Sequence, residues 1–272
     1  GTGGSLTVTG GVDARSGTIN TDLVGGTTLA KTTGGTVTVN AGGLVSGDIL
    51  VEAGLLDYDS TTGITSNVSI SGGEMDLATS LGSGGAISVT GGLLSYNGGT
   101  ELTSISFTSG SIGGSGDVNL GGVTLGSSQT LAPGNSIGSQ TISGISELDG
   151  ATYELEFGLG LAQNNDKLTI EGDVALTALT IDLYTMLDTD TRGNMDGFDQ
   201  SQNYVWEDVL TITGTVTGTV DNITLDTTNV TDSYSGTFSI ADSGGGAYDL
   251  EYNIPEPATM SLLALGGIAM LK

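Results

Sequence analysis

Hydrophobic and polar positions alternate in a short motif that recurs between Val37 and Leu125. An apolar pair separated by one residue is followed, three residues after the pair, by glycine and, five residues after it, by another apolar residue. The pairs are Val37/Val39, Ile49/Val51, Val68/Ile70, Ile87/Val89, Ile105/Phe107 and Val118/Leu120. Glycine follows at Gly42, Gly54, Gly73, Gly92 and Gly110 and, one residue early, at Gly122, and the closing residues are Leu44, Leu56, Met75, Leu94, Ile112 and Leu125. From Val51 onward the steps are 19, 19 and 18 residues, which is the spacing of a stacked repeat.

The motif predicts a strand with one buried face, followed by a glycine corner. Alternation with a period of two places both members of the pair on the same face of a strand, and glycine permits a positive φ at the turn. One such unit cannot bury its apolar residues alone, so neighbouring units must stack. We therefore predict an all-β fold, a parallel β-helix (β-solenoid), in which Val51, Ile70, Val89 and Phe107 lie one above another.

The pattern changes near residue 144 and again near residue 254. Strands beyond 144 are longer and more strictly amphipathic, as in Tyr153 to Phe157 and Leu179 to Leu183. An open end of a strand stack invites aggregation and needs a cap. We predict solenoid repeats over 1–143, terminal coils or a β-sandwich-like cap over 144–253, and a separate tail over 254–272. Because Gly1 lies within the repeat pattern, we expect a fragment or a processed form.

Composition excludes several classes of function. The chain has 31 acidic and 5 basic residues and a net charge of -26, so it cannot neutralise the phosphates of a nucleic acid. It contains neither Cys nor His, and therefore has no thiolate or imidazole for catalysis or for a zinc or haem site. Ser and Thr at outward positions form a polar face, either a solvated surface or a platform for glycans or proteins. We expect no cofactor, with calcium as the one open alternative.

The segment from Asp188 to Asp199 has the length of a twelve-residue calcium loop. Asp188, Asp190, Asp196 and Asp199 occupy positions one, three, nine and twelve, with glycine at position six, where such loops require oxygen ligands and a sharp turn. Arg192 occupies position five, which normally supplies an oxygen. The alternative is an acidic surface loop.

A carbohydrate-active β-helix enzyme is the alternative to a non-catalytic protein. Hydrolysis of a glycoside requires two carboxylates that face each other across a groove. The basic residues Arg15, Lys31, Lys167 and Arg192 are scattered along the chain, and no coil carries a repeated acidic pair on one face. We therefore predict that the protein is not an enzyme.

Residues 130–183 resemble the strand repeat of autotransporter passenger proteins and other exported bacterial β-helix proteins. The resemblance is carried by the Pro-Gly-Asn-Ser turn at 133–136, with the Gly and Thr-rich strand that follow it, and by the segment Asn164-Asn165-Asp166-Lys167-Leu168-Thr169-Ile170-Glu171-Gly172. Ile137 occupies a place where the family often has a second proline. The resemblance implies a β-helix in an exported protein.

The C-terminal tail resembles the PEP-CTERM sorting signal of Gram-negative bacteria. Pro255, Glu256 and Pro257 break the last strand, and an apolar segment, Ala258 to Leu271, leads to Lys272. As a helix this segment would be about 21 Å long, short of a bilayer core of roughly 30 Å. The family usually ends in several Arg residues, whereas this chain has Lys272 alone. An ordinary apolar cap helix is the alternative.

The PEP-CTERM resemblance implies an address and partners. Members carry a Sec signal peptide and are processed by an exosortase, so we expect an exported protein that is held transiently in the inner membrane by its tail. It would then reach the cell surface or extracellular matrix in a structural or adhesive role, with extracellular polysaccharide as an expected partner. A calcium-dependent binding module and a carbohydrate-active protein are the alternatives.

Overall fold

The structure, a computed structural model, describes residues 5–26, 28–40, 45–60, 63–79, 81, 85–134, 136–161 and 163–255. This part of the chain is all-β apart from one short 3-10 helix, η1 (Val220–Asn222). Its strands are β1 (Ser5–Thr7), β2 (Val12–Asp13), β3 (Gly17–Ile19), β4 (Asp22–Val24), β5 (Leu29–Lys31), β6 (Thr36–Val39), β7 (Ile49–Val51), β8 (Leu55–Tyr58), β9 (Val68–Ile70), β10 (Glu74–Leu77), β11 (Ile87–Tyr96), β12 (Ile105–Gly114), β13 (Val118–Gly126), β14 (Gln129–Pro133), β15 (Ser139–Phe157), β16 (Lys167–Glu171), β17 (Val174–Thr185), β18 (Tyr204–Ile212), β19 (Val216–Thr217), β20 (Ile223–Asp226), β21 (Thr237–Gly244) and β22 (Ala247–Asn253).

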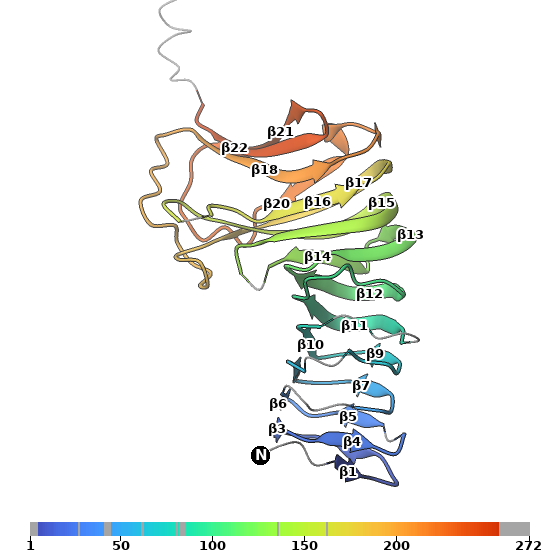
Figure 1. The fold of residues 1–272 in the computed structure, drawn as a ribbon. Helices are drawn as coiled ribbons and strands as arrows, with labels where there is room; N and C mark the ends of the chain where they lie inside the picture. Colours follow the sequence, from blue (N-terminus) through green and yellow to red (C-terminus); the bar gives the residue numbers. More distant parts are fainter. Residues whose placement is uncertain are drawn as a thin grey trace, which may run out of the picture.

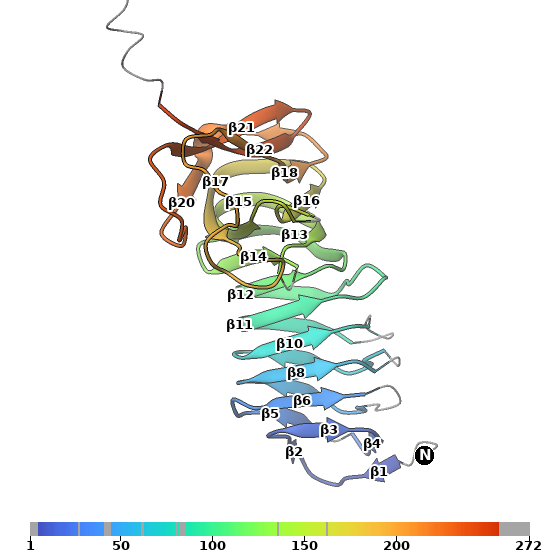
Figure 2. The same cartoon turned by 90° about the vertical axis from the view of Figure 1, so that its left-hand side faces the viewer.

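The strands pair mostly in parallel and follow one another along one axis in the order of the sequence (Figure 1). Two columns of paired strands run side by side. Column A consists of β2, β5, β7, β9 and the first parts of β11 and β12. Column B begins with β3, β6, β8 and β10 and continues through the second part of β11 to β12, β14, β15, β17 and β20. Figure 2 shows the strands of column B in order up the stack.

The predicted apolar stack is confirmed. Val51 pairs with Ile70, Ile70 with Val89, and Val89 with Phe107. These four side chains are between 0% and 4% exposed. Their neighbours across the stack, such as Leu56, Met75 and Leu94, are also fully buried. Each layer therefore buries its apolar stripe against the layers above and below it, as the two-residue period requires.

The first copy of the motif, Val37/Val39, does not lie in the same column of strands as the next copy, Ile49/Val51. Val37 pairs with Leu56 and Val39 with Tyr58, so the pair Val37/Val39 belongs to column B. The residues beneath Ile49 and Val51 in column A are instead Leu29 and Lys31. A lysine at an inward position breaks the apolar pattern, and for this reason the motif did not identify β5.

Lys31 is fully buried among these apolar residues. Its ammonium group donates hydrogen bonds to the backbone carbonyl of Ala53, at 3.0 Å, and to that of Thr33. Both carbonyls lie at the corners between columns A and B. The buried cation is thus satisfied by backbone oxygen atoms, which offsets part of the cost of removing it from water.

Glycine corners connect the two columns. Gly54, Gly73, Gly92 and Gly110 have φ values between 68° and 95°, a region that other residues rarely adopt. The corners also stack closely, since a Cβ atom on Gly73 would lie 2.6 Å from the carbonyl oxygen of Gly54. Glycine is therefore required here both for the turn and for the close approach of successive layers.

The stack becomes wider above β12. Strand β15 runs from Ser139 to Phe157 and spans the predicted boundary at 143/144, pairing with β13, β14, β16 and β17. The alternating residues Tyr153, Leu155 and Phe157 are fully buried. The longer amphipathic strands seen in the sequence thus continue the parallel pairing with a larger interior (Figure 1).

Antiparallel strands cover the last layer. Strand β22 pairs antiparallel with both β18 and β21, and the three lie together at the end of the stack opposite β1 (Figure 1). Trp206, on β18, contacts Phe157 of β15 edge-on, with ring centroids 4.8 Å apart, and its indole N–H donates to the carbonyl oxygen of Gly158. The reversed strand direction and the aromatic side chains close the apolar interior at this end.

The predicted C-terminal apolar helix, Ala258 to Leu271, lies outside the described residues, which end at Pro255. Within residues 5–255, as far as the structure describes them, no helix has the length and apolar character needed to cross a membrane.

The corner glycines lead to a test of the stack. Gly73→Ala should lower the free energy of unfolding by about 2 kcal/mol, because alanine disfavours the left-handed conformation and its Cβ would lie 2.6 Å from the oxygen of Gly54. Gly99→Ala is the matched control, since no atom lies within 4 Å of its added Cβ. Urea denaturation of both variants checks this. Equal stability of the two would contradict the role of the corners.

Candidate functional site

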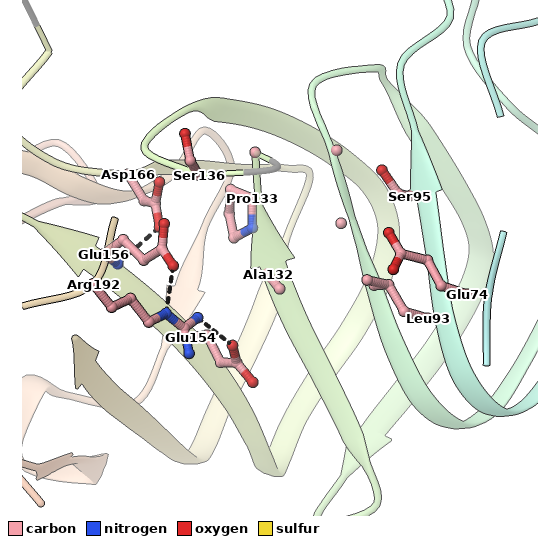
Figure 3. A pocket seen from close by; sticks show the side chains of 13 residues that line it. Glu74, Leu93, Ser95, Ala132, Pro133, Ser136, Glu154, Glu156, Asp166 and Arg192 are labelled. Carbon is pink, nitrogen blue, oxygen red and sulfur yellow. Dashed lines mark hydrogen bonds and ion pairs between the residues drawn. The ribbon is translucent and has the colours of Figure 1, made fainter. Parts of the chain in front are cut away.

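A groove crosses the outward face of column B between β10 and β15. It encloses about 200 Å³ and follows the direction of stacking, from Glu74 at one end to Glu154, Glu156 and Arg192 at the other (Figure 3). These ends belong to strands that are separated by β11, β12 and β14 in the ladder. The groove therefore spans five adjacent strands.

Small side chains create the hollow. Along the outward column of register, Ser95 pairs with Gly113, and Gly113 pairs with Ala132. The strands on either side of these three carry longer side chains. Asp76 of β10 pairs with Ser95, and Glu154 of β15 lines the far end of the groove. The floor of the groove is therefore low at the three middle strands and bounded by carboxylates at its ends.

Arg192 holds the two glutamates at the upper end. Its Nε donates to Glu156 Oε1 at 2.6 Å and its Nη2 donates to Glu154 Oε2 at 3.1 Å. Its guanidinium also lies over the ring of Tyr184, 3.6 Å from the centroid, a favourable cation–π arrangement. Burial lowers the pKa of Arg192, but the bonds and charges of Glu156 and Glu154 outweigh burial and raise this pKa.

Glu156 is partly unsatisfied. Its side chain is 12% exposed, and its Oε2 atom is buried without a hydrogen-bond partner in the part of the chain that the structure describes. A buried carboxylate oxygen normally has a partner. This end of the groove therefore has an acceptor that the protein itself leaves unused.

Asp166 fastens the turn beside the groove. The backbone N–H of Gly138 donates to its Oδ1 and the N–H of Glu156 to its Oδ2, both at 2.8 Å. Lys167 donates its own backbone N–H to the carbonyl of Gly138, and the side-chain amide of Gln163 donates to the same oxygen. Asp166 is only 1% exposed. Both of its oxygen atoms are engaged, so its role is to join the turn at 133–138 to β15 and β16.

These contacts give a physical reason for the two-part motif at 130–183. The Pro-Gly turn and the segment at 164–172 are distant in sequence, yet backbone and side-chain bonds connect them directly. A turn with glycine at 138 leaves an unpaired N–H, and the aspartate of the second segment accepts it.

Burial raises the pKa of Asp166 to about 8. The hydrogen bonds from Glu156 and Gly138 act in the opposite direction, the negative charge of Glu156 adds to the increase, and that of Arg192 opposes it. Tyr153 lies in the interior nearby, and burial, followed by the charge of Asp166, raises the pKa of its hydroxyl. The region beneath the groove thus disfavours negative charge.

The four aspartates of the predicted calcium loop lie in the segment after β17. Asp188 accepts the backbone N–H of Asp190, Asp190 accepts the hydroxyl of Ser136, and Asp199 accepts both the N–H and the hydroxyl of Ser201. These local bonds lower the pKa of Asp188 and that of Asp199. Among the described residues, no three acidic side chains are placed to share a metal ion. The calcium site therefore stays a prediction that these contacts do not support.

Of the predicted sorting residues, the structure describes Pro255 alone. It lies two residues after β22, and Glu256 and Pro257 lie outside the described residues. A family scan of the whole chain finds no matching family model, and a search of curated proteins finds no match. The PEP-CTERM and passenger-repeat assignments therefore remain predictions from the sequence.

Sequence reasoning missed the charged end of the groove. Glu154 and Glu156 alternate with apolar residues in the amphipathic segment Tyr153 to Phe157, and Arg192 is the residue that does not fit the calcium loop. Their meeting depends on the segment after β17 returning to β15, across 36 and 38 residues. The alternation of Glu154 and Glu156 was the only signal in the sequence, and it did not identify their cation.

The raised pKa of Asp166 leads to a pH test. An aspartate in the unfolded chain has a pKa near 4, whereas that of folded Asp166 is about 8. The folded state binds more protons between these values, so the free energy of unfolding should fall as the pH rises from about 4 to about 8. Chemical denaturation across this range should give a steeper fall for the wild type than for Asp166→Asn, which cannot titrate. Parallel curves would contradict the assignment.

Calcium binding at the acidic loop has a direct test. If Asp188, Asp190, Asp196 and Asp199 bind calcium, added calcium should raise the melting temperature of the wild type, because a ligand of the folded state stabilises it. The increase should be absent in Asp190→Ala and retained in Asp242→Ala, a change outside the loop. A wild-type melting temperature that is independent of calcium would exclude the calcium-dependent module.

Proposed function

We propose that this chain is a parallel β-helix that serves as an exported, non-catalytic structural or adhesive protein at the cell surface or in the extracellular matrix. The observation that carries this proposal is the in-register stacking of column B from β3 to β20, followed by the antiparallel strands β18, β21 and β22. A stack whose layers contact only their neighbours grows by repetition and produces a long, regular outer surface. Such a surface suits adhesion or assembly.

The composition supports an extracellular place. A net charge of -26 keeps such a protein soluble and opposes non-specific association. The absence of cysteine makes the fold independent of the redox state of its compartment. The stack thus derives its stability from apolar burial and backbone hydrogen bonding, which are the same on either side of a membrane.

The tail supports a sorting route. In the sequence, Pro255, Glu256 and Pro257 begin two residues after the end of β22, one of the strands that cover the last layer. A tail at this position can be held by a membrane or processed by an exosortase without removing any strand from the stack. Transient anchoring in the inner membrane, followed by release to the surface, is the route that we propose.

A carbohydrate-active enzyme is the second candidate, and the groove is the observation that favours it. Glu154, Glu156 and Arg192 meet there. The sequence did not reveal that these two acidic residues and one basic residue lie together. The non-catalytic proposal is supported by the engagement of these groups. Arg192 binds both glutamates, and Asp166 accepts a backbone N–H at each oxygen, so none of them is poised to transfer a proton to a ligand.

Cell fractionation tests the proposed route. The full chain, exported through a Sec signal peptide in a host that has an exosortase, should leave the inner membrane and reach the surface or medium. Deletion of 254–272 should change this distribution, and so should the triple change Pro255→Ala, Glu256→Ala and Pro257→Ala, which keeps the apolar segment. The matched control is Asn253→Ala, which alters the last strand residue and leaves the tail intact. Identical distribution of all four proteins would remove the sorting proposal.

A further inference from the structure

We propose that the groove on column B binds a linear glycan that carries free amino groups. The proposal deepens the adhesive role proposed above by naming the class of ligand, and it rests on that role. Three features of the molecule support it: the length of the groove, the distribution of charge along it, and the pairing of the strands that form it.

The groove is extended along the stack. It spans β10, β11, β12, β14 and β15, which at about 4.8 Å between neighbouring strands gives a length of about 19 Å. A shallow trough of about 590 Å³ continues it over the glycine corners and shares Glu74 and Leu93 with it. No side chain projects from Gly54, Gly73, Gly92 or Gly110, and the trough is therefore open along several layers. A polymer fits such a surface better than a compact small molecule.

The charge of the groove selects a cationic ligand. Glu74, Glu154 and Glu156 line it, against Arg192 alone. Asp166 also lines it, but with a pKa raised to about 8 it is protonated at mildly acidic pH and adds no charge. Burial, followed by the charge of Asp76, raises the pKa of Glu74, and none of the ion pairs in the described part of the chain includes Glu74. At the other end, Oε2 of Glu156 is buried without a hydrogen-bond partner. Ammonium groups of a ligand would find a carboxylate at each end of the groove, Glu74 at one and Glu154 at the other, whereas an acidic glycan would be repelled. Glu156 lies deeper and adds negative charge beneath the surface.

Acidic side chains on neighbouring strands of column B also favour binding of a cation. Asp57 pairs directly with Asp76 below the groove, and Glu154 pairs with Asp182, which pairs with Asp226, above it. Like charges on adjacent strands repel. The charges of Asp59 and Asp76 accordingly raise the pKa of Asp57, after the larger effect of burial. A ligand with regularly spaced ammonium groups would relieve this repulsion along the stack.

The strand pairing argues against a peptide ligand. A peptide commonly binds a sheet by adding to a free edge through its backbone. The strands beneath the groove are paired on both sides, β11 with β10 and β12, and β14 with β12 and β15. Recognition must therefore use side chains and carbonyl groups on the face of the sheet. Hydroxyl and ammonium groups of a glycan can donate to these acceptors.

Isothermal titration calorimetry of the full purified chain tests the proposal with three probes. A glucosamine oligomer with free amino groups should bind saturably at mildly acidic pH. The N-acetylated oligomer of the same length and a galacturonate oligomer should not bind. Spermine, which has ammonium groups but no sugar, distinguishes a requirement for the glycan from attraction to any polyamine. Binding of spermine as tight as that of the amino oligomer would overturn the glycan assignment.

Charge-matched variants separate the groove from the acidic surface in general. Glu74→Gln and Glu154→Gln should each weaken binding of the amino oligomer about tenfold, equivalent to about 1.4 kcal/mol. Glu171→Gln removes the same charge from an exposed position at the end of β16 and should leave binding unchanged. Equal loss in all three variants, or no saturable binding by the wild type, would overturn the proposal. Because the assay uses purified protein, its outcome is independent of the sorting experiment.

Discussion

Parallel pairing between successive layers, with identical register over the apolar positions, is the constraint on which the molecule depends. Val51, Ile70 and Val89 can form one apolar column only because each layer advances by nearly the same number of residues. The glycine corners make this advance possible, since they turn the chain within a few residues and let the next corner pass close by. Loss of register in one layer would move its apolar side chains to the outer face.

The period of the sequence predicted the stack wherever each layer kept its apolar pair. It failed at β5, where Lys31 occupies an inward position and only its bonds to backbone carbonyls explain why it is tolerated. It also could not assign Val37 and Val39 to column B, because both columns use the same alternation. A local pattern identifies an inward face, whereas the column to which it belongs depends on pairing with other layers.

The charged end of the groove could not be predicted from the sequence for a different reason. Arg192 approaches Glu154 and Glu156 only because the segment after β17 folds back on β15, and no periodic signal describes such a return. The link between Gly138 and Asp166 was more accessible, because both belong to segments that resemble one repeat. Contacts within the repeating ladder can thus be deduced from spacing, while contacts made by the irregular segments require coordinates.

Column B separates stability from recognition along its two faces. Its inward side chains are almost all aliphatic or aromatic and fully buried, and they tolerate little change. Its outward side chains, such as Asp76 and Ala132, are only partly buried and can vary with little effect on the interior. The groove results from this freedom, because small outward residues at three adjacent strands are sufficient to create it.

The buried lysine of β5 has a consequence for how the chain finds its alignment during folding. An aliphatic residue could exchange places with its neighbours in a shifted pairing at little cost, whereas an ammonium group needs the two carbonyl oxygens of Thr33 and Ala53. The Thr33 carbonyl is two residues away in the sequence, whereas the Ala53 carbonyl is supplied by the observed alignment of β5 against β7. A slipped pairing would separate Lys31 from the Ala53 carbonyl, so Lys31 distinguishes its layer from the others in a repetitive ladder and disfavours slipped assemblies of the same strands.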